Sequence, residues 1–296
     1  SNANLISLLV ARNTLFPEIK MKGMSNHQEL CFFVSEHAHY SFDKAANVLG
    51  IGENNLIRVD ADKNHRMLPN DLEFKIKEAI AQGKKPFYVC GTAGTTELGA
   101  FDPLDELQTI AKKYDLWFHT DGAWGGALIF SDKYKYNLKG IGKSDSISWD
   151  AHKLMGIPLI CSVILLKDNS QLLPAVIEQT SDYLFHENEN DEYDLGKKSI
   201  QCGRRVDSLK LWLSLKYNGL QGYEERIDKL IRLAQYMTDK VNKFQDLELL
   251  APTTYCNVNF RYKPNSNIDV KSINKINLSA REDIYKEGLA LFNYCY

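Results

Sequence analysis

Residues 116–126 read LWFHTDGAWGG, an apolar and aromatic run that ends in an aspartate and a glycine-rich turn. Such a run predicts a short buried β-strand over residues 116–120. Similar runs predict further strands over residues 31–35, 55–59, 86–90, 146–149 and 161–167. The runs are continuous rather than alternating, which is typical of strands that are buried on both faces.

Amphipathic patterns lie between these strands. Residues 69–81 place Leu72, Ile76 and Ile80 on one face of a helix, and residues 103–113 repeat the pattern. The alternation of strands with helices predicts an α/β fold, in which helices flank a mainly parallel sheet on both faces.

The composition changes after residue 167. A polar, acidic stretch at 186–198 predicts a surface loop. Helical patterns at 207–217 and 223–242, with Asn218-Gly219 between them, precede a strand-like run at 256–262 and a helical pattern at 270–288. Residues 293–296 resemble the start of another strand. We therefore predict a large domain over residues 1–215 and part of a smaller α+β domain over residues 216–296.

The composition also disfavours several classes of function. The 36 Lys and Arg residues nearly balance the 38 Asp and Glu residues, which argues against binding to nucleic acid or to an anionic membrane surface. No apolar run approaches the roughly 18 residues of a membrane span. The six cysteines show neither a C-x-x-C pair nor clustering with histidine, which disfavours a metal site and indicates reduced thiols in a cytoplasmic protein. A small molecule or a second copy of the chain is the expected partner.

Polar clusters follow four of the predicted strands at their carboxyl ends. They contain His39, Thr96, Asp121 and Lys153, in that order along the chain. In a parallel sheet these ends meet along one edge, where ligands bind. A lysine can form a Schiff base with an aldehyde, an aspartate can keep a pyridine nitrogen protonated, and an imidazole can stack on the ring. The set therefore predicts a site for pyridoxal 5'-phosphate (PLP).

Each of these residues has a simpler interpretation when it is taken alone. A lysine is usually a solvated surface charge, Asp121 could cap a helix, and His39 could be a structural histidine. The Gly-Thr run around Thr96 is by itself a weak turn signal. The functional interpretation is favoured because all four residues occur in order, each directly after a predicted strand. A nicotinamide site is disfavoured because no G-x-G-x-x-G motif opens a helix after a strand.

Five motifs resemble those of the group II PLP-dependent amino-acid decarboxylases, in particular the branch of glutamate decarboxylase and cysteine sulfinate decarboxylase. They are SEHAHYS at 35–41, GTAGTTELGAFDP at 91–103, HTDGAWGG at 119–126, WDAHK at 149–153 and QCGRRVDSLKLWL at 201–213. The resemblance runs through nearly the whole chain. It implies fold type I of the PLP-dependent transferases, the fold of aspartate aminotransferase, with PLP bound by the large domain. It also implies a homodimer with active sites at the subunit interface.

The resemblance assigns roles to residues of this chain. Lys153 would be the Schiff-base lysine, and Asp121 would hold the pyridine nitrogen. The other cofactor contacts that it implies are His39 on one face of the ring, Ala123 on the opposite face, Thr96, and His152 with Asp150 beside the phosphate. Ser1 would be the serine of a phosphate loop before a helix like residues 3–12. Ser1-Asn2-Ala3 is explained equally well as the remnant of an expression tag.

The reaction that the resemblance implies is α-decarboxylation of a short acidic amino acid, such as glutamate, aspartate or cysteine sulfinate. Lys153 and His39 would take part in catalysis. A mobile loop, here about residues 185–198, would close the site with a tyrosine, and Tyr193 is the tyrosine inside it. Family members extend beyond both ends of this chain, and their arginine for the substrate α-carboxylate cannot be assigned to a residue here.

Two alternatives remain open from the sequence. The same cofactor could serve another reaction, such as transamination or elimination, although the H-Y-S and D-A-H-K patterns favour a decarboxylase. The chain could instead be a catalytically silent fragment or paralogue that binds a partner chain. An exposed apolar sheet edge would support that second alternative.

Overall fold

A computed structural model describes residues 1–27, 29–168, 175, 198–201, 203–264 and 268–294 of the chain. The chain divides into two compact units. Unit 1 comprises residues 1–96 and 100–228, and unit 2 comprises residues 97–99 and 229–296. The assignment of domains to residues 1–215 and 216–296 remains a proposal.

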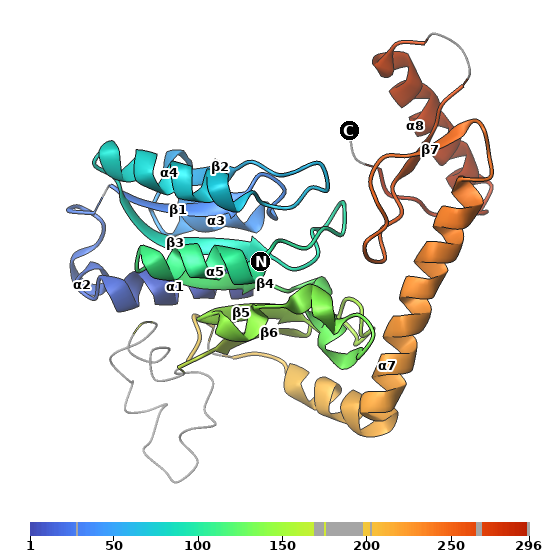
Figure 1. Ribbon diagram of the computed structural model, residues 1–296. Helices are drawn as coiled ribbons and strands as arrows, with labels where there is room; N and C mark the ends of the chain where they lie inside the picture. Colours follow the sequence, from blue (N-terminus) through green and yellow to red (C-terminus); the bar gives the residue numbers. More distant parts are fainter. Residues whose placement is uncertain (28, 169–174, 176–197, 202, 265–267, 295–296) are drawn as a thin grey trace. The chain divides into compact units, whose positions relative to one another are not determined.

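Unit 1 is built around a six-stranded sheet with the order β2-β1-β3-β4-β5-β6 (Figure 1). The strands are β1 Leu30–Ser35, β2 Leu56–Val59, β3 Lys85–Thr92, β4 Trp117–Asp121, β5 Ser146–Asp150 and β6 Ser162–Leu166. The first five strands are parallel, and β6 pairs antiparallel with β5 at the edge. Each predicted strand of this sheet is found within two residues of its predicted bounds, so the predicted α/β fold is confirmed.

Helices cover both faces of this sheet. α1 Asn2–Leu15 and α3 Ser41–Val48 lie on one face, and α4 Pro69–Ala81 and α5 Leu104–Lys113 lie on the other (Figure 1). Short helical segments in the connections are α2 Ile19–Lys22, η1 Glu53–Asn55, η2 Gly125–Phe130, η3 Lys135–Leu138 and η4 Ile141–Lys143. α4 has its predicted bounds and begins with a proline, whose fixed φ and missing N–H suit the first turn of a helix.

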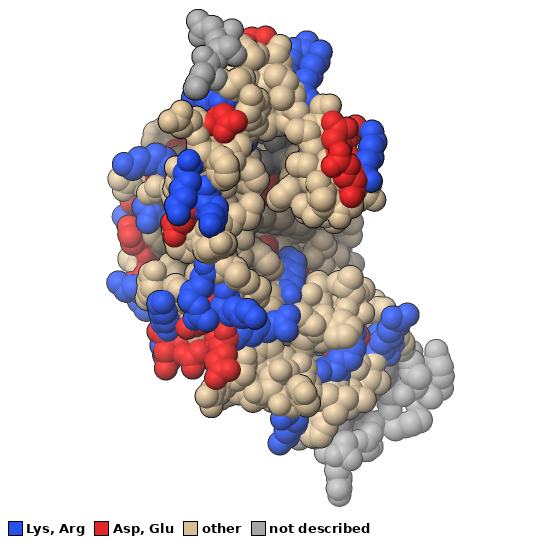
Figure 2. Space-filling view, turned by 90° about the vertical axis from the view of Figure 1, so that its right-hand side faces the viewer, with Lys and Arg blue, Asp and Glu red and all other residues tan. Residues whose placement is uncertain are grey.

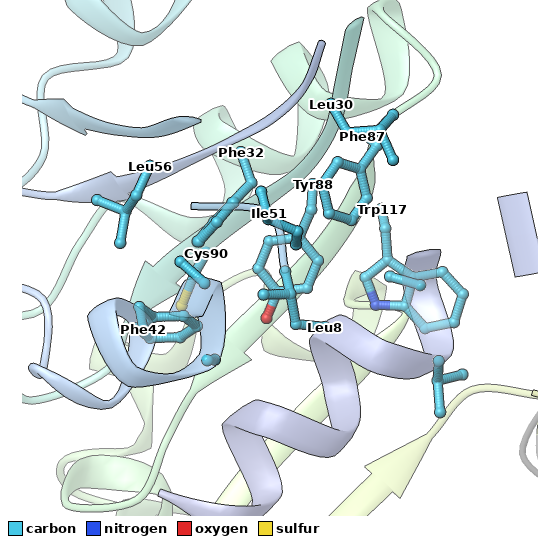
Figure 3. Packing of buried hydrophobic residues seen from close by; sticks show 14 of the residues in the cluster. Leu8, Leu30, Phe32, Phe42, Ile51, Leu56, Phe87, Tyr88, Cys90 and Trp117 are labelled. Atoms are coloured by element: carbon cyan, nitrogen blue, oxygen red, sulfur yellow. The ribbon is translucent and has the colours of Figure 1, made fainter. Parts of the chain in front are cut away.

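Strand residues alternate between the two faces, which decides the core that each one joins. Tyr88 and Trp117 point toward α1 and α3, where they pack with Leu8 and Phe42 (Figure 3). Burial of each such side chain contributes about 1.5–3 kcal/mol to stability. This core holds α1 firmly against the sheet.

Two polar residues continue the side of β4 that faces α1. His119 and Asp121 follow Trp117 at intervals of two residues, and both are buried. Their side chains therefore lie under the amino end of α1 rather than under α5. This alternation places the functional site on the α1 face of the sheet.

The C-terminal part of the chain contains α7 Asp207–Val241, β7 Leu247–Leu249, β8 Phe260–Tyr262 and α8 Val270–Lys286. α7 is divided at Gly219, whose backbone is not helical (φ 65°, ψ 179°). A positive φ favours glycine because other residues are strained there. The predicted break between two helices is therefore confirmed.

Of two strand predictions in this part of the chain, the one over 256–262 is confirmed only at residues 260–262, which form β8. Before β8, Thr254 and Asn257 donate hydrogen bonds from their side chains to the carbonyl oxygens of residues 99 and 97. The strand start predicted over 293–296 is absent at residues 293–294, and residues 295–296 lie outside the described residues. The Phe292 carbonyl accepts a hydrogen bond from Arg281 at 2.6 Å. β7, the partner of β8, was not predicted.

Candidate active site

A pocket lies at the edge of the sheet where the parallel strands end. It is lined by the first turn of α1 and by residues that end or follow β1, β3, β4 and β5: Ser1, Ala3, Asn4, His39, Thr92, Gly94, Thr96, Asp121, Ala123, Trp124, Ser148, Asp150 and Lys153. Thr92, Asp121 and Ser148 stand side by side in register across three strands. The fold thus brings residues that are far apart in the sequence to one pocket.

Asp121 lies at the end of β4 and is 5% exposed. Its carboxylate accepts hydrogen bonds from Asn4 Nδ2 at 2.7 Å, from the Ala123 N–H at 3.0 Å and from Ser148 Oγ at 3.1 Å. Burial opposes ionisation, yet the pKa of Asp121 lies below the usual range, because the charge that His119 gains at low pH, the hydrogen bonds from Asn4 and the Ala123 N–H, and the amine of Lys153 favour the anion. The pocket therefore contains a buried carboxylate that is ionised at neutral pH.

Lys153 lies in the turn that follows β5. Its Nζ is 3.1 Å from Asp150 Oδ2, and its side chain is 32% exposed. Asp150 is fixed in turn by Ser162 on β6, whose hydroxyl donates to Oδ1 of Asp150. A carboxylate held on the sheet therefore positions the amine at the pocket.

His152, between these two residues, is not among the described residues that line the pocket. Its Nδ1 lies 2.9 Å from the carbonyl oxygen of Cys161, and its Nε2 lies 3.8 Å from Asp150 Oδ2. Its role beside a phosphate remains a prediction.

The other expected cofactor contacts surround the same pocket. His39 is half-buried, with Nδ1 2.8 Å from Ser41 Oγ, and burial lowers the pKa of its ring. Ala123 lies in the turn after β4, Thr96 is exposed, and Ser1 is the N-cap residue of α1. These four residues thus lie around the pocket that also contains Asp121.

Glycines allow the turns after β3 and β4 to touch. Gly94 has a φ of +84°, and a Cβ there would lie 3.0 Å from the nitrogen of Gly125. A Cβ on Gly125 would lie 2.5 Å from the carbonyl oxygen of Ala93. Only glycine fits such distances, which gives a physical reason for the glycines in GTAGTT and DGAWGG.

Among the pocket residues that the sequence patterns did not predict, three have polar side chains that matter for the site. Asn4 lies 117 residues before Asp121, and only the packing of α1 on the sheet brings them together. Ser148 had a local signal, because polar residues alternate along β5. Thr92 lines the pocket, and its buried hydroxyl oxygen has no hydrogen-bond partner among the described residues.

Other expectations concern features away from the pocket walls. Tyr193, expected in the loop that closes the site, lies outside the described residues. In the described ranges, no helix is long and apolar enough to cross a membrane, and no cluster of His, Cys, Asp or Glu could hold a metal ion. Figure 2 shows basic and acidic side chains lying beside one another on one face of the molecule.

Comparison with known proteins identifies relatives along the whole chain. Residues 1–263 match the family described as the pyridoxal-dependent decarboxylase conserved domain. The human protein named acidic amino acid decarboxylase GADL1 is 37% identical over 303 residues, which cover 99% of this chain and 58% of the human protein. Its namesake from Xenopus tropicalis is 42% identical over 268 residues, which cover 90% of this chain and 52% of that protein.

A solved structure agrees with these relatives. The crystal structure of mouse CSAD in apo form has a TM-score of 0.94 and 37% sequence identity, and the match covers 99% of this chain and 63% of the mouse chain. The chain therefore spans between about half and two thirds of the length of its similar proteins.

These comparisons confirm the fold type I architecture and the predicted cofactor class. The family match includes all six strands of the large sheet and every residue that lines the pocket. The chain therefore belongs to the pyridoxal-dependent decarboxylase family.

Proposed function

We propose that this chain takes part in PLP-dependent α-decarboxylation of a short acidic amino acid, with release of carbon dioxide and an amine. One observation carries the proposal: an ionised buried carboxylate, Asp121, and an amine, Lys153, line the same pocket. A pyridine nitrogen needs the carboxylate to stay protonated, and an aldehyde needs the amine. The name acidic amino acid decarboxylase, borne by the GADL1 relatives, supports the class of substrate.

The polar groups of the pocket fit PLP. Asp121 would bind the ring nitrogen, and Lys153 would bind the aldehyde carbon. The orphaned hydroxyl of Thr92 is a buried polar group that a bound molecule could satisfy. Buried donors and acceptors are rarely left unpaired in proteins, so this orphan supports a polar ligand at this position.

The remaining contacts are those that the resemblance to the family implies. His39 and Ala123 would flank the two faces of the ring, and Thr96 would contact the cofactor. The phosphate would be held by Ser1 with the N–H groups at the start of α1, and His152 with Asp150 would lie beside it. The amino end of a helix suits an anion because its free N–H groups and its dipole both favour negative charge.

When bound, PLP supplies an electron sink for the charge left on the substrate Cα as carbon dioxide departs. Asp121 would keep a proton on the ring nitrogen through a charge-assisted hydrogen bond. Asp150 orients Nζ of Lys153 from a distance of 3.1 Å. We also propose Tyr193 as the residue that returns a proton to Cα.

Spectroscopy on three forms of the chain tests the cofactor assignment. Wild type, Lys153→Ala and the control Lys77→Ala are titrated with PLP, because the Lys77 side chain is 63% exposed and lies outside the pocket lining. Wild type and the control should develop the visible absorbance band of lysine-bound pyridoxal, whereas Lys153→Ala should not. The band would be missing in the variant because its amine is gone.

Product analysis tests the reaction. Wild type should release carbon dioxide from glutamate, aspartate or cysteine sulfinate, and Lys153→Ala should do so at least about a thousandfold more slowly. If a keto acid formed and no carbon dioxide was released, the reaction would be transamination and the proposed decarboxylation would be wrong. No absorbance band in any form would overturn the cofactor assignment and favour a chain that only binds a partner.

We further propose a homodimer with the active site at the interface. Leu209, Trp212, Leu213 and Tyr217 share one face of α7, and each is at least half exposed. An exposed apolar face of this kind favours contact with a second copy. In analytical ultracentrifugation, Trp212→Glu should shift the chain toward monomer, whereas Tyr136→Glu, at an exposed position outside this face, should not. A wild-type monomer at micromolar concentration would contradict the proposal.

We also propose a reducing compartment, the cytoplasm. Cys31, Cys90, Cys161 and Cys256 are free thiols. Burial raises the pKa of Cys31 to about 12, which keeps this thiol protonated and unreactive. Fractionation of the source cells should recover the protein with the cytosol, and recovery in a secreted fraction would contradict this location.

A further inference from the structure

We propose that Asn4 is a positioning residue whose single carboxamide fixes both Asp121 and His39. The proposal rests on the proposed function only for what those two residues do. Asn4 lies in the first turn of α1 and is 3% exposed. Its Nδ2 lies 2.7 Å from Asp121 Oδ2 and 3.0 Å from Ser41 Oγ, and its Oδ1 lies 3.2 Å from His119 Nε2. One side chain thus touches three polar groups, two on β4 and one at the start of α3.

The orientation of this carboxamide follows from its contact with Asp121. An ionised carboxylate can only accept hydrogen bonds, so the amide group 2.7 Å away must be the NH₂ group of Asn4. The amide oxygen is then turned to His119 Nε2, and this oxygen can only accept. His119 must therefore carry a proton on Nε2.

The protonation state of His119 completes this line of donors. Burial lowers the pKa of His119 to about 4, against the attraction of Asp121, so its ring is neutral at neutral pH. Its bare Nδ1 accepts from Ser146 Oγ at 2.8 Å, and Ser146 Oγ accepts from the indole N–H of Trp117 at 2.8 Å. The donors thus run in one direction from the indole to the carboxylate, and each proton has one position.

The second N–H of Asn4 starts a shorter chain of hydrogen bonds, which runs through Ser41 to His39. Ser41 Oγ accepts from Asn4 and donates to His39 Nδ1 at 2.8 Å, and the Ser41 backbone N–H points at the same nitrogen from 3.3 Å. Two donors at Nδ1 place the proton of the neutral His39 ring on Nε2. Asn4 therefore orients the Ser41 hydroxyl, which together with the Ser41 backbone N–H sets the tautomer of His39, and it also orients the carboxylate of Asp121.

Asparagine suits this position because it both donates and accepts. An aspartate in its place would be a second carboxylate beside Asp121, and like charges so close cannot both ionise. Alanine would leave the buried N–H of His119 without an acceptor. The two chains of hydrogen bonds therefore depend on the carboxamide itself rather than on the bulk of the side chain.

The test uses proton–nitrogen NMR spectra of the isotope-labelled chain without PLP, which report the tautomer and the pKa of each histidine ring. His39→Gln and His119→Gln assign the signals. In wild type, both rings should carry their proton on Nε2, and His119 should stay neutral down to about pH 4. In Asn4→Ala, the His119 ring should populate the Nδ1-protonated tautomer, and the His39 ring should do so to a smaller extent, because the Ser41 backbone N–H still faces its Nδ1. PLP affinity, measured separately, should fall about 10- to 100-fold in Asn4→Ala, because a hydrogen bond to a charged group is lost.

Asn13→Ala is the matched control. Asn13 is a buried asparagine on the same helix, and its amide donates to the Ala175 carbonyl at 2.7 Å, away from the pocket lining. Its replacement should lower the thermal midpoint of unfolding but leave the His39 and His119 tautomers in place. Its PLP affinity should stay within about threefold of wild type. If Asn4→Ala and Asn13→Ala changed the histidine tautomers equally, the effect would come from a general loss of structure, and the proposal would be overturned.

Asn4→Asp provides a second variant of the same shape in case Asn4→Ala does not fold. It keeps an acceptor for His119 but loses the donor to Ser41, because the one proton that two such close carboxyl groups retain lies between them. It should therefore keep the His119 tautomer, release the His39 tautomer and bind PLP more weakly than Asn4→Ala. A wild-type ring protonated on Nδ1, or a His39 tautomer that no Asn4 variant changes, overturns the proposal.

The result also separates the two proposals. Nε2 tautomers in wild type that are lost in the variants would support the positioning role even if wild type failed to bind PLP. Such a failure would overturn only the proposed function.

Discussion

Two carboxyl groups at the same end of the sheet, Asp102 and Asp121, are almost equally buried yet titrate in opposite directions. Asp102 is 3% exposed and Asp121 is 5% exposed. The pKa of Asp102 is raised to about 6, whereas the pKa of Asp121 lies below its usual range. Burial raises the pKa of any carboxyl group, so the neighbours must cause the difference.

The neighbours of Asp102 are mainly backbone groups. It accepts hydrogen bonds from the N–H groups of Met67 and Thr92, each at 2.7 Å, and so ties the segment after β2 to the end of β3. Burial and the charge of Asp62 outweigh these bonds and raise its pKa. Asp121 has His119, the side-chain amide of Asn4 and the amine of Lys153 near it as well. Neighbouring basic groups together with placed donors, rather than exposure, separate the site carboxylate from the structural one.

The largest expected effect comes from removing each charge in turn. Asp121→Asn keeps the volume of the side chain but loses the partner of the ring nitrogen. Removal of one partner of a buried charge pair costs about 3–5 kcal/mol, so turnover should fall about 10²- to 10⁴-fold. Asp102→Asn should keep turnover within about tenfold of wild type. Steady-state rates of carbon dioxide release check this, and an equal loss in both variants would remove the distinction.

This contrast also shows how much of the site the sequence predicts. Asp121 and Lys153 were predicted because each directly follows an apolar strand, and the carboxyl ends of parallel strands meet at one edge. Asn4 was not predicted, because it lies 117 residues before Asp121 and reaches it only through the packing of α1 on the sheet. No local sequence pattern indicates that contact. Strand ends are a local property, whereas the partner of a buried carboxylate depends on tertiary packing.

The second expected effect concerns the pH dependence of stability. The folded-state pKa of Asp102 is about 6, above its ordinary value of 3.8, so the folded chain holds this proton more tightly than the unfolded chain. The free energy of unfolding should therefore fall as the pH rises from about 4 to 6, by up to about 3 kcal/mol from this group. Asp102→Asn cannot ionise, so this part of the pH dependence should disappear. Urea unfolding of the chain without PLP at several pH values measures it.

Asp105→Asn is the control for that experiment. Hydrogen bonding to Lys143 lowers the pKa of Asp105, so its contribution is present above its usual pKa and is lost as the pH falls. Its replacement should leave the change between about pH 4 and 6 in place. A wild-type curve that rises over this range, with the same slope in Asp102→Asn, would contradict the raised pKa.

The fold was more predictable than the site, because the sequence pattern of an apolar strand followed by an amphipathic helix occurs several times along the chain. Six apolar runs with helical patterns between them support one another, so an error of two residues at the end of β3 does not change the sheet. β7 and β8 are only three residues long, and so short a segment cannot show the alternation of apolar and polar residues that indicates a strand. The missed strand β7 and the overlong strand predicted around β8 therefore have the same cause: strands this short are defined by their partners.

The smallest expected effect comes from Thr92, which contacts Asp102 through its backbone and lines the pocket that contains Asp121. Its backbone N–H donates to Asp102, whereas its buried hydroxyl has no hydrogen-bond partner among the described residues. Thr92→Val keeps the backbone bond and the shape of the side chain but replaces the hydroxyl by a methyl group. The chain without PLP should therefore be equally stable or up to about 1 kcal/mol more stable, because an unpaired buried hydroxyl is removed.

PLP affinity should nevertheless fall about 3- to 10-fold in Thr92→Val, because the bound molecule loses a hydrogen-bond partner. Thr109→Val, on the exposed face of α5, should change neither PLP affinity nor the stability of the pocket region. Thermal unfolding without PLP and a PLP titration measure the two quantities separately. If Thr92→Val lowered the stability but left the PLP affinity unchanged, the hydroxyl would belong to the structural surroundings of Asp102 and not to the ligand site around Asp121.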